Sequence, residues 1–141
     1  MTVENDPARA EEASGNLTAA GLAEVVEQRV ADAGQVLAGE QTQGWPVVFL
    51  DAERPAYVSY WPDLWRILGL GGLLVVDNCI SHADQVAGFR ALVDATPSCR
   101  SSLVPVGAGL LLVSKDRCSG GSADDLDDLV AWTAVHATFE G

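Results

Sequence analysis

Two runs of apolar residues in the middle of the chain each end on an acidic residue. Residues 47–50 are followed by Asp51, and residues 72–76 are followed by Asp77 and Asn78. A continuous apolar run is typical of a strand that is buried on both faces of a parallel sheet. Open α/β sheets bind their ligands beyond the carboxyl ends of the strands. The pattern therefore predicts that these three polar residues share one rim of a parallel sheet and form a small-molecule or metal site.

Extended and helical patterns alternate along the chain. Apolar runs predict strands at residues 2–4, 25–30, 46–51, 73–77, 101–106 and 110–115. Apolar spacings of three and four, with capping residues, predict helices at residues 7–20, 32–37 and 55–68, and one after the capping pair of residues 81–84. This alternation indicates a doubly wound α/β domain. The last two strands, joined by Gly107-Ala108-Gly109, indicate an antiparallel hairpin.

Two of these helices show an apolar face that we expect to pack on the sheet. The first face consists of Tyr57, Trp61, Leu64, Trp65 and Leu68. The second consists of Val86, Phe89, Leu92 and Val93. Between the two helices, residues 69–72 are rich in glycine, which predicts a turn before the second acid-ended strand.

The end of the chain has a different character. Residues 118–122 resemble a linker, and residues 124–139 have the spacing of an acidic amphipathic helix. We therefore expect a domain over residues 1–116 and an acidic tail over residues 117–141, with one helix at most and no chemistry of its own. His136 lies in this tail, and we expect it at the surface.

Composition narrows the possible partners. The chain has 141 residues, of which 48% are hydrophobic, and this suits one domain with a true core. Its formal net charge of -12 excludes binding of nucleic acid or anionic membranes by charge. No apolar stretch approaches the roughly 20 residues that cross a bilayer, and the amino terminus does not resemble a signal peptide. We expect a cytoplasmic protein whose three scattered cysteines are reduced.

Several polar residues stand where chemistry is expected. Glu4 ends the first strand, where an acid in a Rossmann-type domain binds ribose hydroxyls; the alternative is an exposed terminal acid. Asp51, Asp77 and Asn78 supply the hard oxygen donors that Mg²⁺ prefers; the alternative is that the two aspartates cap neighbouring helices. His82 follows them and suits a general base, a metal ligand or a surface histidine.

In order and spacing, several segments together resemble a known family. These are residues 49–54 with Tyr57, residues 68–78 (LGLGGLLVVDN) and residues 105–110, supported by Ser81-His82-Ala83 and by residues 16–17, 20–22 and 31–33. They resemble the class I S-adenosylmethionine-dependent O-methyltransferases, and most of all the bacterial relatives of catechol and caffeoyl-CoA O-methyltransferase. The resemblance covers residues 2–115.

The resemblance implies a role for each matching residue. Glu4 would bind the ribose of S-adenosylmethionine, and Asp32 and Ala33 would lie against its adenine. Asp51 would border the cofactor and, with Asp77 and Asn78, would hold a divalent metal, usually Mg²⁺. The metal would orient a hydroxyl of a small-molecule acceptor toward the methyl group. Since members of this family are often dimers, a homodimer is a further expectation.

The chain differs from the family at the position of the catalytic base. Metal-dependent members carry a catalytic lysine three residues after the first aspartate, where this chain has Arg54. An arginine stays protonated and is a poor base. We therefore take His82 as the substitute base and keep Arg54 as a second catalytic candidate.

The chain also departs from the family in its sheet. The family's first strand, its glycine-rich loop and its N-terminal helices have no counterpart here, so we expect a Rossmann-like sheet without that strand and loop. In the family this strand lies between the strands that carry Glu4 and Asp51. Two buried edges would stay unpaired unless they pair with each other. A truncated gene product, a misplaced start and half of a split protein are all compatible with this pattern.

Two other functions remain open at this point. One is a non-catalytic remnant or interaction module on a methyltransferase scaffold, which the missing glycine-rich loop favours. The other is a phosphorylatable receiver domain, in which Asp51 would be the phosphoacceptor and Lys115 the strand-end lysine. Against the receiver, Asp77-Asn78 replaces the expected serine or threonine.

Overall fold

The computed structural model of the chain describes residues 1–117 and 134–136. Its helices are α1 (Pro7–Ala19), α2 (Ala33–Gly39), η1 (Arg54–Ala56, a 3₁₀ turn), α3 (Tyr57–Ile67) and α4 (Ala83–Ala95). Its strands are β1 (Thr2–Glu4), β2 (Gln28–Val30), β3 (Trp45–Asp51), β4 (Leu68–Val76), β5 (Cys99–Val104), β6 (Leu110–Lys115) and β7 (Ala134–His136).

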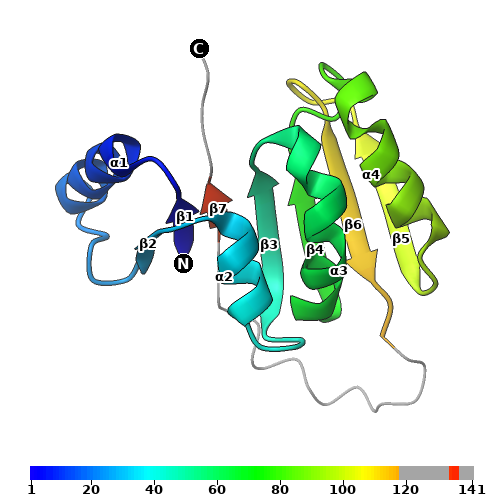
Figure 1. Cartoon of the computed structure of the whole chain (residues 1–141), viewed down its shortest axis with the longest axis horizontal. Helices are drawn as coiled ribbons and strands as arrows, with labels where there is room; N and C mark the ends of the chain where they lie inside the picture. The colour runs from blue at the N-terminus through cyan, green and yellow to red at the C-terminus, as the bar shows by residue number, and fades with distance from the viewer. Residues whose placement is uncertain (118–133, 137–141) are drawn as a thin grey trace.

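The strands form two sheets. Strands β5, β6, β4, β3 and β7 lie side by side in that order, and β1 pairs with β2 in a separate two-stranded sheet. β3 runs parallel to both β4 and β7, whereas β6 runs antiparallel to β4 and to β5. Figure 1 shows α2, α3 and α4 over one face of the sheets, with β7 between β1 and β3. The expected α/β architecture with a terminal antiparallel hairpin is confirmed.

Local sequence explains where the first helices begin. Asp6 caps α1 by accepting a hydrogen bond from the Ala8 N–H at 2.8 Å, and Pro7 occupies the first turn, where no donor is lost. Asp32 caps α2 in the same way, accepting from the Gln35 N–H at 3.0 Å. Asp32 lies two residues after the end of β2. The cap therefore also fixes where α2 begins beyond the carboxyl end of this strand.

The core lies between the five-stranded sheet and helices α3 and α4. The rings of Tyr57 and Trp61 each meet Phe89 edge to face, with centroids 5.6 and 5.5 Å apart. Val48 and Leu50 of β3 are also almost completely buried. The predicted face of α3 is therefore the core face, with Trp65 only half-buried beside it.

Three local expectations are wrong. Residues 69–72 belong to β4 instead of a turn, although the pairing with β3 is irregular there, shifting between Trp45 and Val47. His82, which makes no side-chain capping bond, precedes α4 in place of the predicted capping pair. Leu92 of the expected buried face is 38% exposed.

The end of the chain also differs from the expectation. Residues 134–136, which fall inside the predicted helix of the tail, form a strand that pairs with β3. The rest of that helix lies outside the described residues, and the division of the chain at residue 116 stays a prediction. The edge of β3 that was expected to stay unpaired, unless it paired with the edge of β1, is paired with this strand instead.

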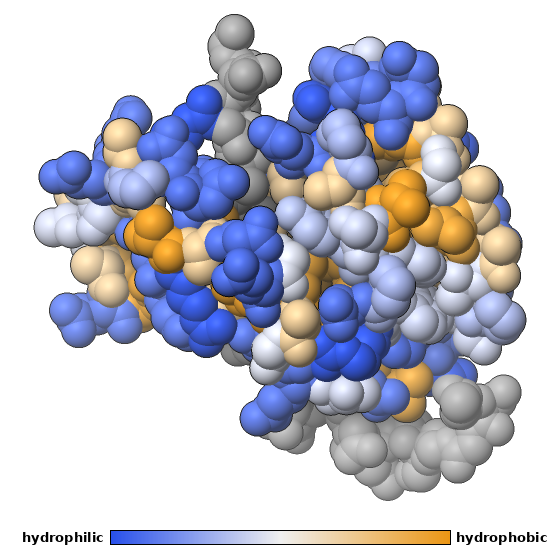
Figure 2. Space-filling view, viewed as in Figure 1, coloured by the Kyte–Doolittle hydropathy of each residue, from blue (hydrophilic) through white to orange (hydrophobic). Residues whose placement is uncertain are grey.

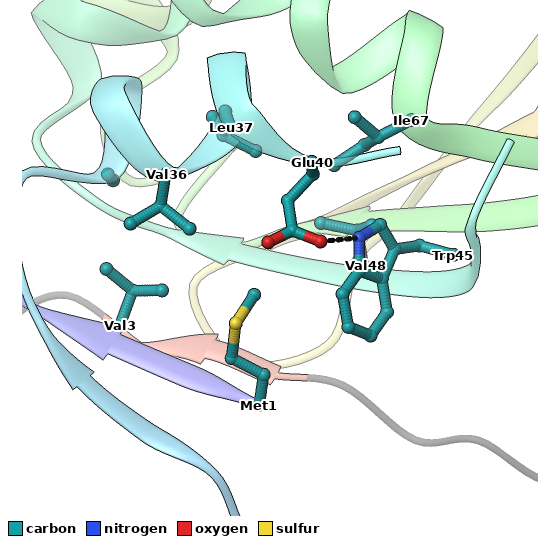
Figure 3. Close-up of a pocket in the computed structure, with 9 residues that line it drawn as sticks. Met1, Val3, Val36, Leu37, Glu40, Trp45, Val48 and Ile67 are labelled. Carbon is teal, nitrogen blue, oxygen red and sulfur yellow. Dashed lines mark hydrogen bonds between the residues drawn. The ribbon is translucent and has the colours of Figure 1, made fainter. Parts of the chain in front are cut away.

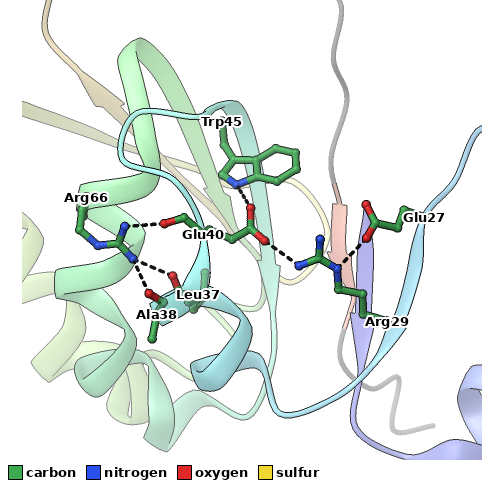
Figure 4. Close-up of polar contacts among 7 residues, drawn as sticks. All are labelled: Glu27, Arg29, Leu37, Ala38, Glu40, Trp45 and Arg66. Carbon is green, nitrogen blue, oxygen red and sulfur yellow. Dashed lines mark hydrogen bonds and ion pairs between the residues drawn. The ribbon is translucent and has the colours of Figure 1, made fainter.

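Arginine and glutamate side chains connect the α2 segment to its surroundings (Figure 4). Arg66 of α3 donates to the carbonyl oxygens of Leu37 and Glu40, at 2.8 and 2.6 Å. The Glu40 carboxylate in turn binds Arg29 of β2 at 2.6 Å and the Trp45 indole at 3.0 Å. These contacts satisfy carbonyls that the end of a helix leaves unpaired, and they join elements of both sheets.

The surface on the helix side is mostly hydrophilic, with apolar side chains in small separate patches (Figure 2). Among the described residues, no helix is long and apolar enough to cross a membrane.

Candidate functional site

The acidic residues at the strand ends lie along one rim. Asp51 is the last residue of β3, and its neighbour β4 ends one residue before Asp77. The register aligns Leu50 with Val76, so Asp51 and Asp77 leave parallel strands at the same level. Glu4 ends β1, whose arrow points in the same direction as that of β3 in Figure 1. Glu4 and Asp51 are only 8% and 7% exposed, which is unusual for carboxylates.

Asn78 and Asp51 are in contact. The Asn78 side-chain amide donates to Asp51 Oδ1 at 3.3 Å. Asn78 adopts a left-handed backbone with φ of 62°, which asparagine tolerates better than most residues, and its N–H donates to Asp77 Oδ1 at 2.7 Å. The structure thus brings the side chains of Asp51 and Asn78 together, while the Asp77 carboxylate binds the backbone N–H of Asn78 in the turn after β4.

The hairpin after α4 fixes the loop that follows Asn78. The N–H of Cys79 donates to the Gly109 carbonyl at 2.9 Å, and the N–H groups of Ile80 and Ser81 donate to the Ala108 carbonyl at 2.9 and 3.0 Å. The loop therefore has three backbone anchors in the turn between β5 and β6. A rigid anchor of this kind keeps Asn78 at the rim.

A backbone hydrogen bond holds His82 next to the rim. Its N–H donates to the Asn78 carbonyl at 3.2 Å, and its ring Nδ1 lies 2.8 Å from the Ser81 hydroxyl. The pair with Ser81 fixes the orientation of the imidazole, whose tautomer depends on which of the two groups donates. The role of His82 as a base stays a prediction.

Arg54 begins the 3₁₀ turn just after Asp51. Its Nε atom is buried and has no hydrogen-bond partner among the described residues. A buried donor without a partner is rare in folded proteins and suits a position that contacts a bound ligand. This observation favours a binding role for Arg54, since a guanidinium remains protonated.

Tyr57 contacts the backbone of the segment that follows Asp51. Its phenolic oxygen accepts a hydrogen bond from the Ala52 N–H at 3.2 Å, and the residue is 1% exposed. Burial raises the pKa of Tyr57 far above its ordinary value, and the negative charge of Asp51 raises it further, so this phenol stays neutral. From the sequence, Tyr57 is expected in the core, and only its position six residues after Asp51 indicates that it could reach this segment.

Asp32 and Ala33, the predicted adenine contacts, lie where α2 begins. Ala33 is buried, whereas Asp32 is exposed and caps the helix. The ring of Tyr60 packs against the next residue: a Cβ added to Gly34 would lie 3.0 Å from Tyr60 Cε1. Desolvation raises the pKa of Tyr60, as does the charge of Asp32. The role of this aromatic side chain could not be predicted from the sequence pattern, because Tyr60 lies off the apolar face of α3.

Glu4 also has a structural contact. Its Oε1 atom accepts a hydrogen bond from the Asp6 N–H at 2.8 Å, which bends the chain from β1 into α1. The structure therefore places Glu4, Asp32 and Asp51 on three strand ends, but it shows no direct contact between Glu4 and the other two carboxylates among the described residues.

The metal ligands predicted from the sequence are brought together only in part. Asp51 and Asn78 meet, and both offer oxygen atoms that suit a hard cation such as Mg²⁺. Among residues 1–117 and 134–136, no group of three or more His, Cys, Asp or Glu side chains is placed to hold a metal ion.

A small apolar hollow lies away from these residues (Figure 3). It lies under α2, toward the amino end of β3, and its lining includes Met1, Val3, Trp45 and Val48. Its polar neighbour Glu40 is bound to Trp45. The hollow is therefore a packing feature between β1 and β3 and not part of the rim.

Fold and rim together define a Rossmann-like α/β domain with polar side chains at the carboxyl ends of its parallel strands, where domains of this class bind their ligands. Residues 1–116 match the family model described as O-methyltransferase, and the chain belongs to this family. Lys115, which the receiver interpretation placed beside Asp51, instead donates to the Trp65 and Leu68 carbonyls at the opposite end of β4. The receiver interpretation is therefore wrong.

Known relatives agree with this assignment. A catechol O-methyltransferase of Mycobacterium tuberculosis is 35% identical over 101 residues, which is 65% of this chain and 46% of that protein. The solved structure of cofactor-bound Rv0187 from MTB is 30% identical, with a TM-score of 0.69, and the match covers 80% of this chain and 59% of that one. TomG from Streptomyces achromogenes, an O-methyltransferase solved with SAM, is 23% identical, with a TM-score of 0.69 and coverage of 82% and 60%.

The chain is short in comparison with these proteins. It spans between 38% and 49% of the length of the curated relatives that it matches.

Proposed function

We propose that this chain carries the rim of an S-adenosylmethionine-dependent O-methyltransferase that acts on a hydroxyl of a small molecule. The observation that carries this proposal is the contact between Asp51 and Asn78 at adjacent strand ends, in a chain whose first 116 residues match the family. The relatives solved with SAM or a bound cofactor support the same cofactor here.

In this proposal the rim divides into a cofactor part and an acceptor part. Glu4 binds the ribose hydroxyls, because a nearly buried carboxylate at a strand end is a strong acceptor for them. Ala33 forms an apolar wall for the adenine, with Asp32 at its edge. The ring of Tyr60, beside Gly34, adds an aromatic surface on which an adenine can stack.

The acceptor part is built from the turn after β4 and the turn after β3. S-adenosylmethionine, when bound, would supply the electrophilic methyl group. A divalent ion would be held by Asp51, Asp77 and Asn78 and would supply positive charge that favours ionisation of the acceptor hydroxyl. His82 takes the proton of the acceptor hydroxyl, and Arg54 Nε, which has no hydrogen-bond partner among the described residues, binds a negatively charged group of a ligand. Catalysis then depends on positioning these groups in line with the methyl group.

A second candidate is a non-catalytic module on the same scaffold. It is favoured because Glu4 and Asp32 each bind the backbone that follows them, so both carboxylates have structural reasons to be present. Such a module would lack turnover and would bind the cofactor weakly or not at all.

The cofactor part is tested by calorimetry with S-adenosylhomocysteine. We expect the whole chain to bind it and Glu4→Gln to bind it about 10- to 100-fold more weakly, since hydrogen bonds to a charged acceptor contribute about 1.5–3 kcal/mol. The glutamine keeps an acceptor for the Asp6 N–H, so the fold is retained. Glu11→Gln, in the exposed part of α1, is the matched control and should bind like the unaltered chain.

The outcomes separate the two candidates. Equal affinity of Glu4→Gln and Glu11→Gln would remove Glu4 from the ribose site. No heat of binding by the unaltered chain at high protein concentration would favour the non-catalytic module. Binding followed by transfer of labelled methyl groups to phenolic acceptors, stimulated by Mg²⁺ and lost in Asp51→Asn, would establish the metal-assisted enzyme.

A further inference from the structure

Ser81 and His82 are neighbours in the loop after Asn78, and their side chains are in contact. The Ser81 hydroxyl oxygen lies 2.8 Å from Nδ1 of the His82 ring, so one of the two groups donates a hydrogen to the other. Nε2, the second ring nitrogen, has no hydrogen-bond partner in the part of the chain that the structure describes. The protein therefore engages one nitrogen of this half-buried imidazole and leaves the other for a ligand.

The backbone holds both residues of this pair in place. The Ser81 N–H donates to the Ala108 carbonyl at 3.0 Å, in the turn between β5 and β6. The His82 N–H donates to the Asn78 carbonyl at 3.2 Å, and the His82 carbonyl accepts from the Gln85 N–H at 3.0 Å. Because both backbones are anchored, the contact between the two side chains is formed before any ligand binds.

A third group indicates which side chain of the pair donates. The Ser81 hydroxyl oxygen also lies 3.5 Å from the Asn78 carbonyl oxygen, and a carbonyl can only accept. This carbonyl has two lone pairs, of which the His82 N–H uses one. A hydroxyl has a single hydrogen. When that hydrogen points to the carbonyl, Nδ1 must carry its own hydrogen and donate it to the hydroxyl oxygen. Only this direction gives a continuous chain from Nδ1 through the hydroxyl to the carbonyl.

We propose that Ser81 is a positioning residue that keeps neutral His82 in the tautomer with hydrogen on Nδ1, so that Nε2 holds the lone pair. The proposal rests on the proposed function, because it names the atom of His82 that acts there as the base. The O–H bond of the acceptor breaks, its electron pair stays on the oxygen, and the proton forms the new N–H bond at Nε2 before it passes to water. Neutral imidazole has a lone pair on only one nitrogen, so the opposite tautomer has no base at Nε2.

The same chain of hydrogen bonds connects the base to the rim. Asn78 provides the carbonyl at the end of the chain, and its side-chain amide donates to Asp51 at 3.3 Å. One residue thus orients both the base and the end of β3. The alternative is an exposed surface pair, in which the Ser81 hydroxyl exchanges freely with water and does not determine the tautomer.

Nitrogen NMR of the imidazoles in the whole chain tests the proposal, because the chemical shifts of Nδ1 and Nε2 report which nitrogen carries the hydrogen. The spectra are recorded well above the ordinary imidazole pKa of about 6.5, and His82→Gln assigns the signals of the two histidines. We expect the Nδ1–H tautomer at His82. In Ser81→Ala the ratio should shift about five-fold toward Nε2–H, which corresponds to about 1 kcal/mol, an ordinary value for one neutral hydrogen bond.

Two further variants control this measurement. Ser81→Thr retains the hydroxyl and should restore the Nδ1–H tautomer. Ser59→Ala is the matched control, because the Ser59 hydroxyl also binds a carbonyl three residues earlier, that of Ala56 at 2.7 Å, but has no histidine as a neighbour. It should leave the tautomer of His82 unchanged. A His82 ring that is mainly Nε2–H in the unaltered chain, or an unchanged ratio in Ser81→Ala, would overturn the proposal.

Kinetics distinguish a failure of this proposal from a failure of the proposed function. Ser81→Ala should lower kcat about five-fold with little change in KM, because the tautomer affects the base and not the contacts that bind the acceptor. Ser81→Thr should restore kcat. Loss of kcat without a change of tautomer would overturn the role given to Ser81. Absence of methyl transfer by the unaltered chain would instead contradict the proposed function, and the NMR result would still decide whether Ser81 determines the tautomer.

Discussion

Glu4, Asp32 and Asp77 each accept a hydrogen bond from the backbone that directly follows them. Short polar side chains at strand ends often serve in this way, since the first residues of a turn or helix present unpaired N–H groups. The same carboxylates are the candidates for ligand binding. Substitutions that retain an acceptor, such as glutamine for glutamate, therefore separate the two roles better than alanine does.

The hydroxyl of Tyr57 binds the backbone directly after Asp51. Tyr57→Phe leaves the buried Ala52 N–H without its acceptor, and an unsatisfied buried donor costs about 1–3 kcal/mol. We expect the urea unfolding midpoint to fall accordingly. Tyr60→Phe, which removes a half-buried hydroxyl that has no hydrogen-bond partner in the described part of the chain, should leave the midpoint nearly unchanged. Equal midpoints for the two variants would show that the Ala52 contact contributes nothing.

The rim residues could be predicted from sequence, whereas their support could not. An apolar run that ends on an acid fixes both the strand and the place of the acid, so Asp51 and Asn78 were expected together. The contact of Tyr57 with Ala52 depends on how α3 turns back over the strand end. Local patterns do not encode that angle, and an aromatic residue on an apolar face gives no sign that its hydroxyl has a partner.

At the scale of elements, β1, β3, the helices and the β5–β6 hairpin follow from hydrophobic periodicity. The glycines at residues 69–72 were expected to form a turn, but they lie in the irregular first part of β4. A strand bulge and a turn have similar sequence patterns, because both favour glycine for its conformational freedom. The strand at residues 134–136 was not predicted, since three residues carry too little periodicity to show their pairing.

The hairpin turn offers a test of how elements hold the rim. Gly109 has φ of 93°, and a Cβ there would lie 2.4 Å from Ile80 Cγ1 and 2.7 Å from the Ile80 nitrogen. Gly109→Ala should therefore cost about 3 kcal/mol, from backbone strain and from displacement of the loop that carries Asn78. Gly107→Ala, with φ of 58° and open space around its Cβ, should cost only about 1 kcal/mol. Thermal unfolding of both variants measures the difference, and equal costs would contradict a tight anchor at Gly109.

At the scale of the whole molecule, the β1–β2 sheet and α2 are held to the rest by two different connections. One is the strand pairing of β7 described above. The other is the polar network in which Arg66 of α3 binds the carbonyls of Leu37 and Glu40, while the Glu40 carboxylate binds Arg29 and Trp45 (Figure 4). The two connections lie at opposite ends of β3, so each resists a different motion of the smaller sheet.

Arg66→Ala tests the second connection. It leaves the last carbonyls of α2 without a charged donor, and because Arg66 is about one-third exposed, the expected loss of stability is moderate, about 1–2 kcal/mol. Exchange of amides in β2 and α2 should accelerate more than exchange in β5 and β6, because only the former elements are tied by this network. Arg66→Lys should restore little, since one ammonium cannot reproduce the planar fork that spans several carbonyls.

Arg100→Ala is the control for charge removal alone, because the ion pair that Arg100 forms in the described part of the chain, with Asp116 at the far edge of the sheet, is exposed. Its stability and its exchange pattern should match those of the unaltered chain. If Arg66→Ala loosened all elements equally, the two sheets would unfold as one unit. The network would then add stability to the whole molecule without serving as a separate attachment of the smaller sheet.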